Sequence, residues 1–150
     1  MKNLITETET ASRPRWMIVD DNKDILAWMR ELVSKMVDAD IQCFDSPHSA
    51  LATFAAAPDA VDFVITDLEM PGMSGIELGD RLRKLSPSLK VLLATGSEIL
   101  TNREAAQKGF CGVLRKPFPF PSLRGALAAA GALGMPVENN SEKLSALTMA

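Results

Sequence analysis

The sequence has 150 residues and a formal net charge of −3, and this length is enough for one domain with a hydrophobic core. Hydrophobic residues make up 47% and charged residues 23%, so the composition is that of a globular domain rather than a disordered chain. It contains no basic cluster for nucleic acid, no signal-peptide segment, and no apolar run near the ~20 residues of a membrane span. We therefore expect a cytoplasmic protein in which Cys43 and Cys111, which lack metal or redox spacing, stay reduced.

Strand-like and helix-like segments alternate five times along the chain. Residues 1–14 are polar and aperiodic and predict a flexible tail, as do residues 131–150, which leaves a domain at residues 15–130. The expected strands cover residues 16–19, 40–44, 62–66, 90–94 and 111–115. The expected helices cover residues 22–37, 47–56, 75–85, 100–108 and 122–130.

The expected strands at residues 16–19, 62–66 and 90–94 are nearly continuous apolar runs. Such runs are typical of strands buried on both faces, in a parallel sheet with helices on each side. The alternation therefore predicts an α/β fold: a (βα)5, doubly wound, five-stranded parallel sheet of order 2-1-3-4-5, which is flavodoxin-like. In that order the ligand crevice opens at the carboxyl ends of the first and third strands. The second and fifth strands form opposite edges, so no disulfide between Cys43 and Cys111 is expected.

Three aspartates follow the first and third strands, at the predicted crevice: Asp20, Asp21 and Asp67. Two carboxylates about 4 Å apart repel each other by about 1–4 kcal/mol, so such a cluster needs a shared proton or a cation. Oxygen ligands without a nearby histidine or thiolate select a hard divalent ion, Mg²⁺ first and Mn²⁺ second.

The next two strands end at Thr95 and Lys116, which supply a hydroxyl group and a cation to the same crevice. Together with a metal held by acids, these groups are the parts needed to hold a phosphoryl group. Asp67 lies at the centre of the set and is the expected nucleophile, which would form an aspartyl-phosphate. Each of these residues alone is more typical of turns and helix starts, so the prediction depends on their joint placement.

The sequence resembles the receiver domain of response regulators in two-component signalling. The resemblance rests on "VDDN" at residues 19–22, "VITDLEMPGMSGIEL" at 64–78, "LLATG" at 92–96 and "LRKPF" at 114–118, and it covers about residues 15–130. It implies that Asp67 accepts a phosphoryl group from the phosphohistidine of a sensor histidine kinase or histidine phosphotransfer protein. Such a protein is a signalling phosphoacceptor and not an enzyme with a separate substrate.

The same resemblance implies roles for the other residues of the site. Asp21 would bind Mg²⁺ directly and Asp20 largely through water, and the backbone carbonyl of Glu69 would complete the protein ligands. Thr95 and Lys116 would bind the phosphoryl oxygens, and the peptide bond that follows Lys116 would be cis.

The sequence departs from the family at the position three residues before Lys116. Receivers usually carry Tyr or Phe there, and this ring moves inward when the threonine moves to the phosphoryl group; here the residue is Val113. Movement of Thr95 remains expected, whereas ring switching is not. Glu69 and Ser97, each two residues after a site residue, are expected to influence the lifetime of the phosphoryl group.

The leading hypothesis is a stand-alone, single-domain signalling switch that acts through protein–protein contacts. The roughly 20 residues after the last expected helix are too few for a DNA-binding output domain. A relay intermediate, a phosphate sink and a dimer formed on phosphorylation remain open. The rival hypothesis is a Mg²⁺-dependent phosphatase of the haloacid dehalogenase type, which also forms an aspartyl-phosphate. Its nucleophile ends the first strand in a D-x-D pattern, which is absent here.

Overall fold

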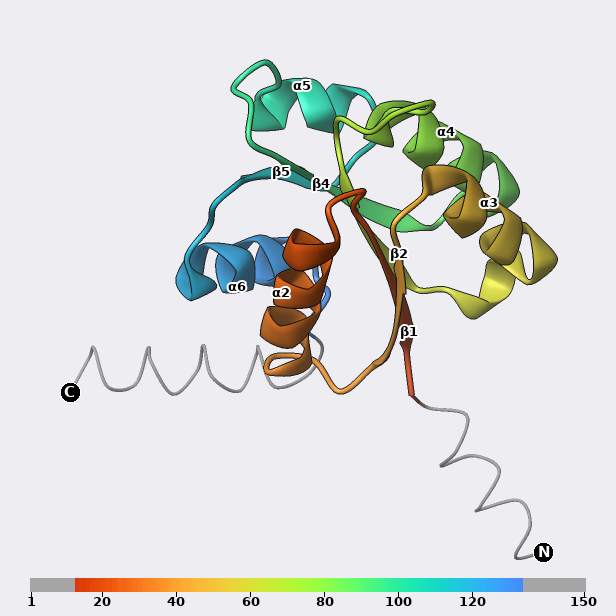
Figure 1. Ribbon diagram of the computed structural model, residues 1–150, viewed down its shortest axis with the longest axis horizontal. Helices are drawn as coiled ribbons and strands as arrows, with labels where there is room; N and C mark the ends of the chain where they lie inside the picture. Colours follow the sequence, from red (N-terminus) through yellow and green to blue (C-terminus); the bar gives the residue numbers. More distant parts are fainter. Residues whose placement is uncertain (1–12, 134–150) are drawn as a thin grey trace, which may run out of the picture.

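The computed structural model describes residues 13–133, so the predicted tails lie almost entirely outside the described part. Within it, five parallel strands form one sheet in the order β2-β1-β3-β4-β5, which confirms the predicted topology (Figure 1). The strands are β1 (Arg15–Val19), β2 (Asp40–Phe44), β3 (Phe63–Asp67), β4 (Lys90–Thr95) and β5 (Gly112–Arg115). The helices are α2 (Lys23–Ser34), α3 (Pro47–Ala56), α4 (Gly75–Leu85), α5 (Asn102–Gln107) and α6 (Phe120–Ala129), with a short 3-10 turn, η1 (Pro58–Ala60).

Helices cover both faces of the sheet: α2 and α6 lie on one side and α3, α4 and α5 on the other (Figure 1). Because side chains alternate along a strand, Trp16 and Ile18 of β1 belong to the core under α2 and α6, whereas Met17 and Val19 belong to the opposite core. All five residues of β3 are buried. This double coverage is the reason why the central strands are continuously apolar.

Short polar side chains start most of the helices. Asn22 caps α2, Ser46 caps α3 with a proline in the first turn, and Ser74 caps α4. The fourth expected helix begins at Asn102, not at residue 100, because Thr101 and Glu104 form a reciprocal capping box. At the starts of α2, α3, α4 and α5, a side chain thus binds amides that the first helical turn leaves without partners.

Two other helix boundaries differ from the prediction by more than one residue. Helix α2 ends at Ser34 rather than at residue 37, because the amides of Met36 and Val37 both bind the Val33 carbonyl and the chain turns there. Helix α6 starts two residues early, at Phe120, because a proline is accommodated in the first helical turn, where no amide donor is needed.

Strands β2 and β5 form the two edges of the sheet. Cys43 on β2 and Cys111 just before β5 are both free, and burial raises the pKa of each thiol. None of the helices in residues 13–133 is long and apolar enough to cross a membrane.

Candidate functional site

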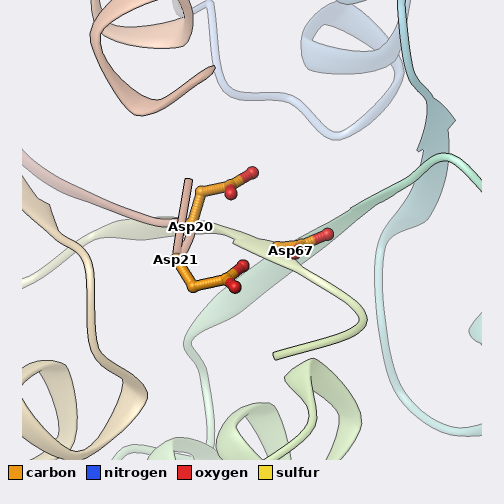
Figure 2. Close-up of side chains that lie close together, drawn as sticks. All are labelled: Asp20, Asp21 and Asp67. Atoms are coloured by element: carbon orange, nitrogen blue, oxygen red, sulfur yellow. The ribbon is translucent and has the colours of Figure 1, made fainter. Parts of the chain in front are cut away.

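The three aspartates meet at the carboxyl end of the sheet. Asp20 and Asp21 follow β1, Asp67 is the last residue of β3, and these two strands are paired neighbours. The three side chains lie close together (Figure 2), and one carboxylate oxygen from each residue lies within 4.8 Å of those of the other two. Asp20 and Asp67 are buried and Asp21 is exposed. The topology therefore joins residues that are 46 positions apart into one acidic site.

Lys116 connects the far edge of the sheet to this acidic cluster. Its Nζ atom donates hydrogen bonds to Asp20 Oδ2 at 2.9 Å and to Asp67 Oδ1 at 3.0 Å. Its backbone amide binds the Thr95 carbonyl at 2.7 Å, and the bond to Pro117 is cis, as the resemblance implied. Burial alone would lower the pKa of Lys116, but hydrogen bonds and charges from the two carboxylates outweigh it and raise the pKa. Lys116 is thus held in the charged form.

The environment raises the pKa of the Asp67 carboxyl group above its ordinary value. Burial is the largest cause, and the hydrogen bond from Lys116 opposes it. The negative charge of Asp20, and to a smaller extent that of Asp21, adds to the increase. Lys116 therefore offsets the repulsion from the two other carboxylates, and burial accounts for the net increase in the pKa of Asp67.

The loop after Asp67 is fixed by backbone contacts. The Leu68 amide binds the Ala94 carbonyl at 2.9 Å, and the Gly75 amide binds the Leu68 carbonyl at 2.8 Å. A Cβ atom on Gly75 would lie 2.2 Å from the Asp67 carbonyl oxygen, so a side chain there would displace the loop. The Thr66 hydroxyl donates to the same oxygen at 3.0 Å. The sequence analysis did not assign these supporting roles to Thr66 and Gly75.

Thr95, at the end of β4, is completely buried, and its hydroxyl oxygen accepts a hydrogen bond from the Ser97 amide at 3.0 Å. Val113, on the adjacent strand β5, is half-buried and packs against the core under α3, α4 and α5. Arg115 binds the carbonyl oxygens of Ser97 and Leu100 and so ties the loop after β4 to β5. Sequence analysis had not singled out Arg115, because its partners are backbone atoms of another segment.

The acidic cluster fits a hard divalent cation. Both carboxylate oxygens of Asp20 already accept a hydrogen bond, one from the Asn22 amide and one from Lys116. A metal ion would therefore contact Asp20 through a water molecule, or through an oxygen that also accepts one of these hydrogen bonds. Asp67 uses only Oδ1, for Lys116, and within residues 13–133 no hydrogen bond reaches Oδ2. Asp21 is exposed and forms no hydrogen bond or ion pair in the same range. Free carboxylate oxygens on Asp21 and Asp67 match the ligands that Mg²⁺ prefers.

An open cleft of about 470 Å³ leads to Asp67. Glu69, Gly96 and Lys116 line it on the polar side, and the apolar residues Ile25, Trp28 and Pro117 line it as well. The sequence analysis did not place Ile25 or Trp28 at the site. They come from α2, and only the packing of that helix beside β1 brings them to the cleft.

Comparison with known proteins places the chain in a family. Residues 16–128 match the family model for the response regulator receiver domain, and the chain belongs to this family. The family consists of signalling proteins of two-component systems and is not a classical enzyme class. Receiver domains bind Mg²⁺ at an acidic pocket of this kind and interact with histidine kinases or phosphotransfer proteins. Membership gives no support to the phosphatase alternative.

Individual relatives agree with this placement. Sporulation initiation phosphotransferase F of Bacillus subtilis is 27% identical over 112 residues, which cover 74% of this chain and 88% of that protein. The C4-dicarboxylate transport transcriptional regulatory protein DctD of Rhizobium meliloti is 31% identical over 109 residues, which cover 72% of this chain but only 23% of DctD. The first relatives that the chain matches are thus longer proteins, of which it spans less than half.

A solved structure shows the same fold. The crystal structure of a response regulator receiver domain protein from Clostridium thermocellum superimposes with a TM-score of 0.70 at 26% identity. The match covers 87% of this chain and 98% of that one.

Proposed function

We propose that this receiver domain accepts a phosphoryl group on Asp67 from the phosphohistidine of a sensor histidine kinase or a histidine phosphotransfer protein. One observation carries the proposal: the carboxylate of Asp67 lies at the tip of a buried strand, faces an open cleft, and has one oxygen bound by Lys116 at 3.0 Å. The second oxygen is free to act as a nucleophile or to bind a metal. A rigid strand thus presents a reactive carboxylate to the donor.

In the proposed reaction an Asp67 oxygen forms a bond to phosphorus while the bond from phosphorus to the donor nitrogen breaks. Lys116 is positioned to stabilise the phosphoryl oxygens, because its ammonium group already lies beside Asp67. Mg²⁺, or Mn²⁺, held by Asp20, Asp21, Asp67 and the backbone carbonyl of Glu69 would supply the positive charge that offsets repulsion between two anions.

The conformational response is proposed to start at Thr95. To bind a phosphoryl oxygen, its hydroxyl group has to turn from the Ser97 amide, which it now holds at 3.0 Å. The freed amide lies in the loop that Arg115 ties to β5, so this loop would rearrange. Val113 has no aromatic ring to swing inward, and the response therefore depends on the loop itself.

Signalling is proposed to proceed through protein–protein contacts that sense this loop. Glu69 is exposed and Ser97 half-buried at the rim of the site, where they can affect the access of hydrolytic water and hence the lifetime of the phosphoryl group. A dimer that forms on phosphorylation is a further outcome of the same change in surface.

Intact-mass spectrometry after mixing the protein with Mg²⁺ and phosphoramidate tests the proposal. We expect one added phosphoryl group in the wild type and none in Asp67→Asn. Asp59→Asn is the matched control, because it makes the same change of side chain in the exposed turn before the opposite end of β3. Labelling of Asp67→Asn, or a folded wild type that stays unlabelled, would refute the proposed role of Asp67.

A further inference from the structure

The peptide group that follows Asp67 is held at both of its ends. Its N–H group, which belongs to Leu68, binds the Ala94 carbonyl at 2.9 Å. Its carbonyl oxygen, which belongs to Asp67, accepts a hydrogen bond from the Thr66 hydroxyl at 3.0 Å. The first contact is made by the backbone of the sheet, whereas the second is made by a side chain. Substitution of Thr66 therefore removes one of the two contacts and leaves the other in place.

Thr66 donates its hydrogen bond at the point where β3 loses a partner strand. Strand β1 ends at Val19, which pairs with Thr66, so Asp67 lies one residue beyond the last pair between β1 and β3. The C=O and N–H groups of a trans peptide point in opposite directions, and here the N–H group points to β4. The Asp67 carbonyl consequently points to the side on which β1 has ended. The Thr66 hydroxyl supplies a donor that the neighbouring strand does not.

The surroundings of this hydrogen bond are closed. Thr66 is completely buried. Val64, two residues earlier on β3, belongs to the core under α3, α4 and α5, and Thr66 faces the same core because side chains alternate along a strand. The Gly75 backbone lies so near the Asp67 carbonyl oxygen that a Cβ atom there would be 2.2 Å away. A water molecule needs space and several polar partners, which an apolar core does not offer. Loss of the hydroxyl would therefore leave the carbonyl without this donor, and the peptide group would rotate more easily.

Rotation of this peptide group would displace both parts of the site that it connects. On one side is the Asp67 carboxylate, which Lys116 holds at 3.0 Å. On the other side the chain leads to Glu69, whose backbone carbonyl is a proposed metal ligand. A displacement of about 1 Å at a reacting group can cost about 10²-fold in rate. A hydroxyl group that contacts neither the donor nor the metal ion would in this way influence the reaction.

We infer that Thr66 is a positioning residue for the phosphorylation of Asp67. Its hydroxyl group fixes the peptide group after Asp67, and through it the direction of the Asp67 carboxylate and the position of the Glu69 carbonyl. The inference rests on the proposed phosphoacceptor role of Asp67. It adds no step to that reaction, because Thr66 forms no bond to phosphorus and transfers no proton.

Two substitutions separate the hydroxyl group of Thr66 from its methyl group. Thr66→Val keeps the branched shape and loses the hydroxyl, whereas Thr66→Ser keeps the hydroxyl and loses a buried methyl. With Mg²⁺ and phosphoramidate, we expect Thr66→Val to be labelled about ten-fold more slowly than the wild type, which corresponds to about 1.4 kcal/mol. Thr66→Ser should stay within about two-fold. Both changes disturb a buried position, so a purely structural role of Thr66 would not separate their rates in this way.

A second measurement needs neither the donor nor the metal ion. Amide hydrogen exchange in the presence of EDTA reports how firmly the Leu68 N–H group is held. The Leu92 amide, in the middle of β4, is the reference for global unfolding, and the ratio of the two exchange rates is compared between variants. We expect this ratio, Leu68 to Leu92, to rise about ten-fold in Thr66→Val and to keep its wild-type value in Thr66→Ser.

Controls separate the possible failures. Thr53→Val makes the same change at an exposed position of α3 and should alter neither the labelling rate nor the exchange ratio. A folded wild type that phosphoramidate leaves unlabelled would overturn the proposed function and the positioning role with it. A labelled wild type with equal rates in Thr66→Val and Thr66→Ser, or with an unchanged exchange ratio in Thr66→Val, would overturn the positioning role alone. If Thr66→Val does not fold, Thr66→Ala and Thr66→Ser provide the same comparison, because they differ only in the hydroxyl group.

Discussion

Replacing Asp67 by Asn should make the metal-free protein more stable at neutral pH. The variant removes one negative charge from a cluster of three carboxylates and one lysine. The ordinary pKa of Asp is 3.8, and burial and the neighbouring carboxylates raise that of Asp67. A carboxyl group whose pKa is raised by folding stabilises the protein fully below its unfolded pKa and loses this contribution as the pH rises through the folded pKa. The ionised Asp67 side chain therefore costs stability at pH 7.

The distances give the size of the effect. Lys116 lies 3.0 Å from Asp67, an attraction of about 5.5 kcal/mol at an effective dielectric constant of 20. Asp20 and Asp21 lie within 4.8 Å, and each repels Asp67 by at least about 3.5 kcal/mol at the same dielectric constant. Because Asp21 is exposed and its repulsion is screened, the repulsions and the attraction nearly cancel, and the burial of the ionised carboxylate remains as the cost. We therefore expect Asp67→Asn to gain about 0.5–1.5 kcal/mol.

Urea unfolding in the presence of EDTA measures this gain. The difference between Asp67→Asn and wild type should be full at pH 7 and should disappear as the pH falls below the ordinary pKa of Asp. Asp59→Asn should change the free energy of unfolding by no more than about 0.5 kcal/mol, as is usual for exposed positions. If Asp67→Asn is less stable than the wild type at pH 7, the attraction to Lys116 outweighs the repulsion and the cost of burial together, and the reasoning is wrong.

Mg²⁺ should reverse the order of the same two proteins. A ligand that binds only the folded state stabilises it by about 2.7 kcal/mol at a concentration one hundred times its Kd. The wild type should gain this stability, whereas Asp67→Asn, with one carboxylate fewer at the site, should gain much less. An equal gain in both proteins would show that Asp67 does not contribute to the metal site.

Two further predictions concern packing and the loop after β4. Gly79→Ala in α4 should destabilise the protein by about 1–2 kcal/mol, because the new Cβ atom would lie 2.3 Å from the buried ring of Phe110. Gly125→Ala in α6 meets nothing within 4 Å and should instead stabilise by about 0.5–1 kcal/mol in urea unfolding; equal effects of the two changes would refute the clash. Arg115→Gln should speed amide hydrogen exchange in the loop after β4, because two carbonyl contacts are lost. Arg124→Gln, at an exposed position of α6, should leave that exchange unchanged, and equal protection in both variants would contradict the role of Arg115.

The order of strands and helices, and the residue at the tip of each strand, follow from the sequence alone. The third strand carries an uninterrupted apolar run from Phe63 to Ile65, and only a strand covered on both faces requires this, so the parallel sheet and its crevice could be predicted. Because the carboxyl ends of parallel strands share one edge, Asp20, Asp67 and Lys116 had to lie near one another. Helix starts are a local property too: Ser46 and Ser74 each stand just before a helix, and their hydroxyl groups accept backbone amides of the first turn.

Only the tertiary structure decided which residues of different segments contact one another, because no pattern in the sequence links these segments. The sequence marks Trp28 as an apolar residue of an amphipathic helix, but the packing of α2 against β1 and the contact with Phe118 bring its ring to the cleft. The same holds for Arg115, whose partners are backbone carbonyls, because every residue has one and no residue type reveals which are used. Gly75 is a further example. A side chain at this position would collide with the Asp67 carbonyl oxygen, and the sequence does not show that this oxygen lies there. The periodicity of apolar residues and the order of the segments indicate which face of each segment is buried. Which residues that face contacts depends on how the helices pack on the sheet.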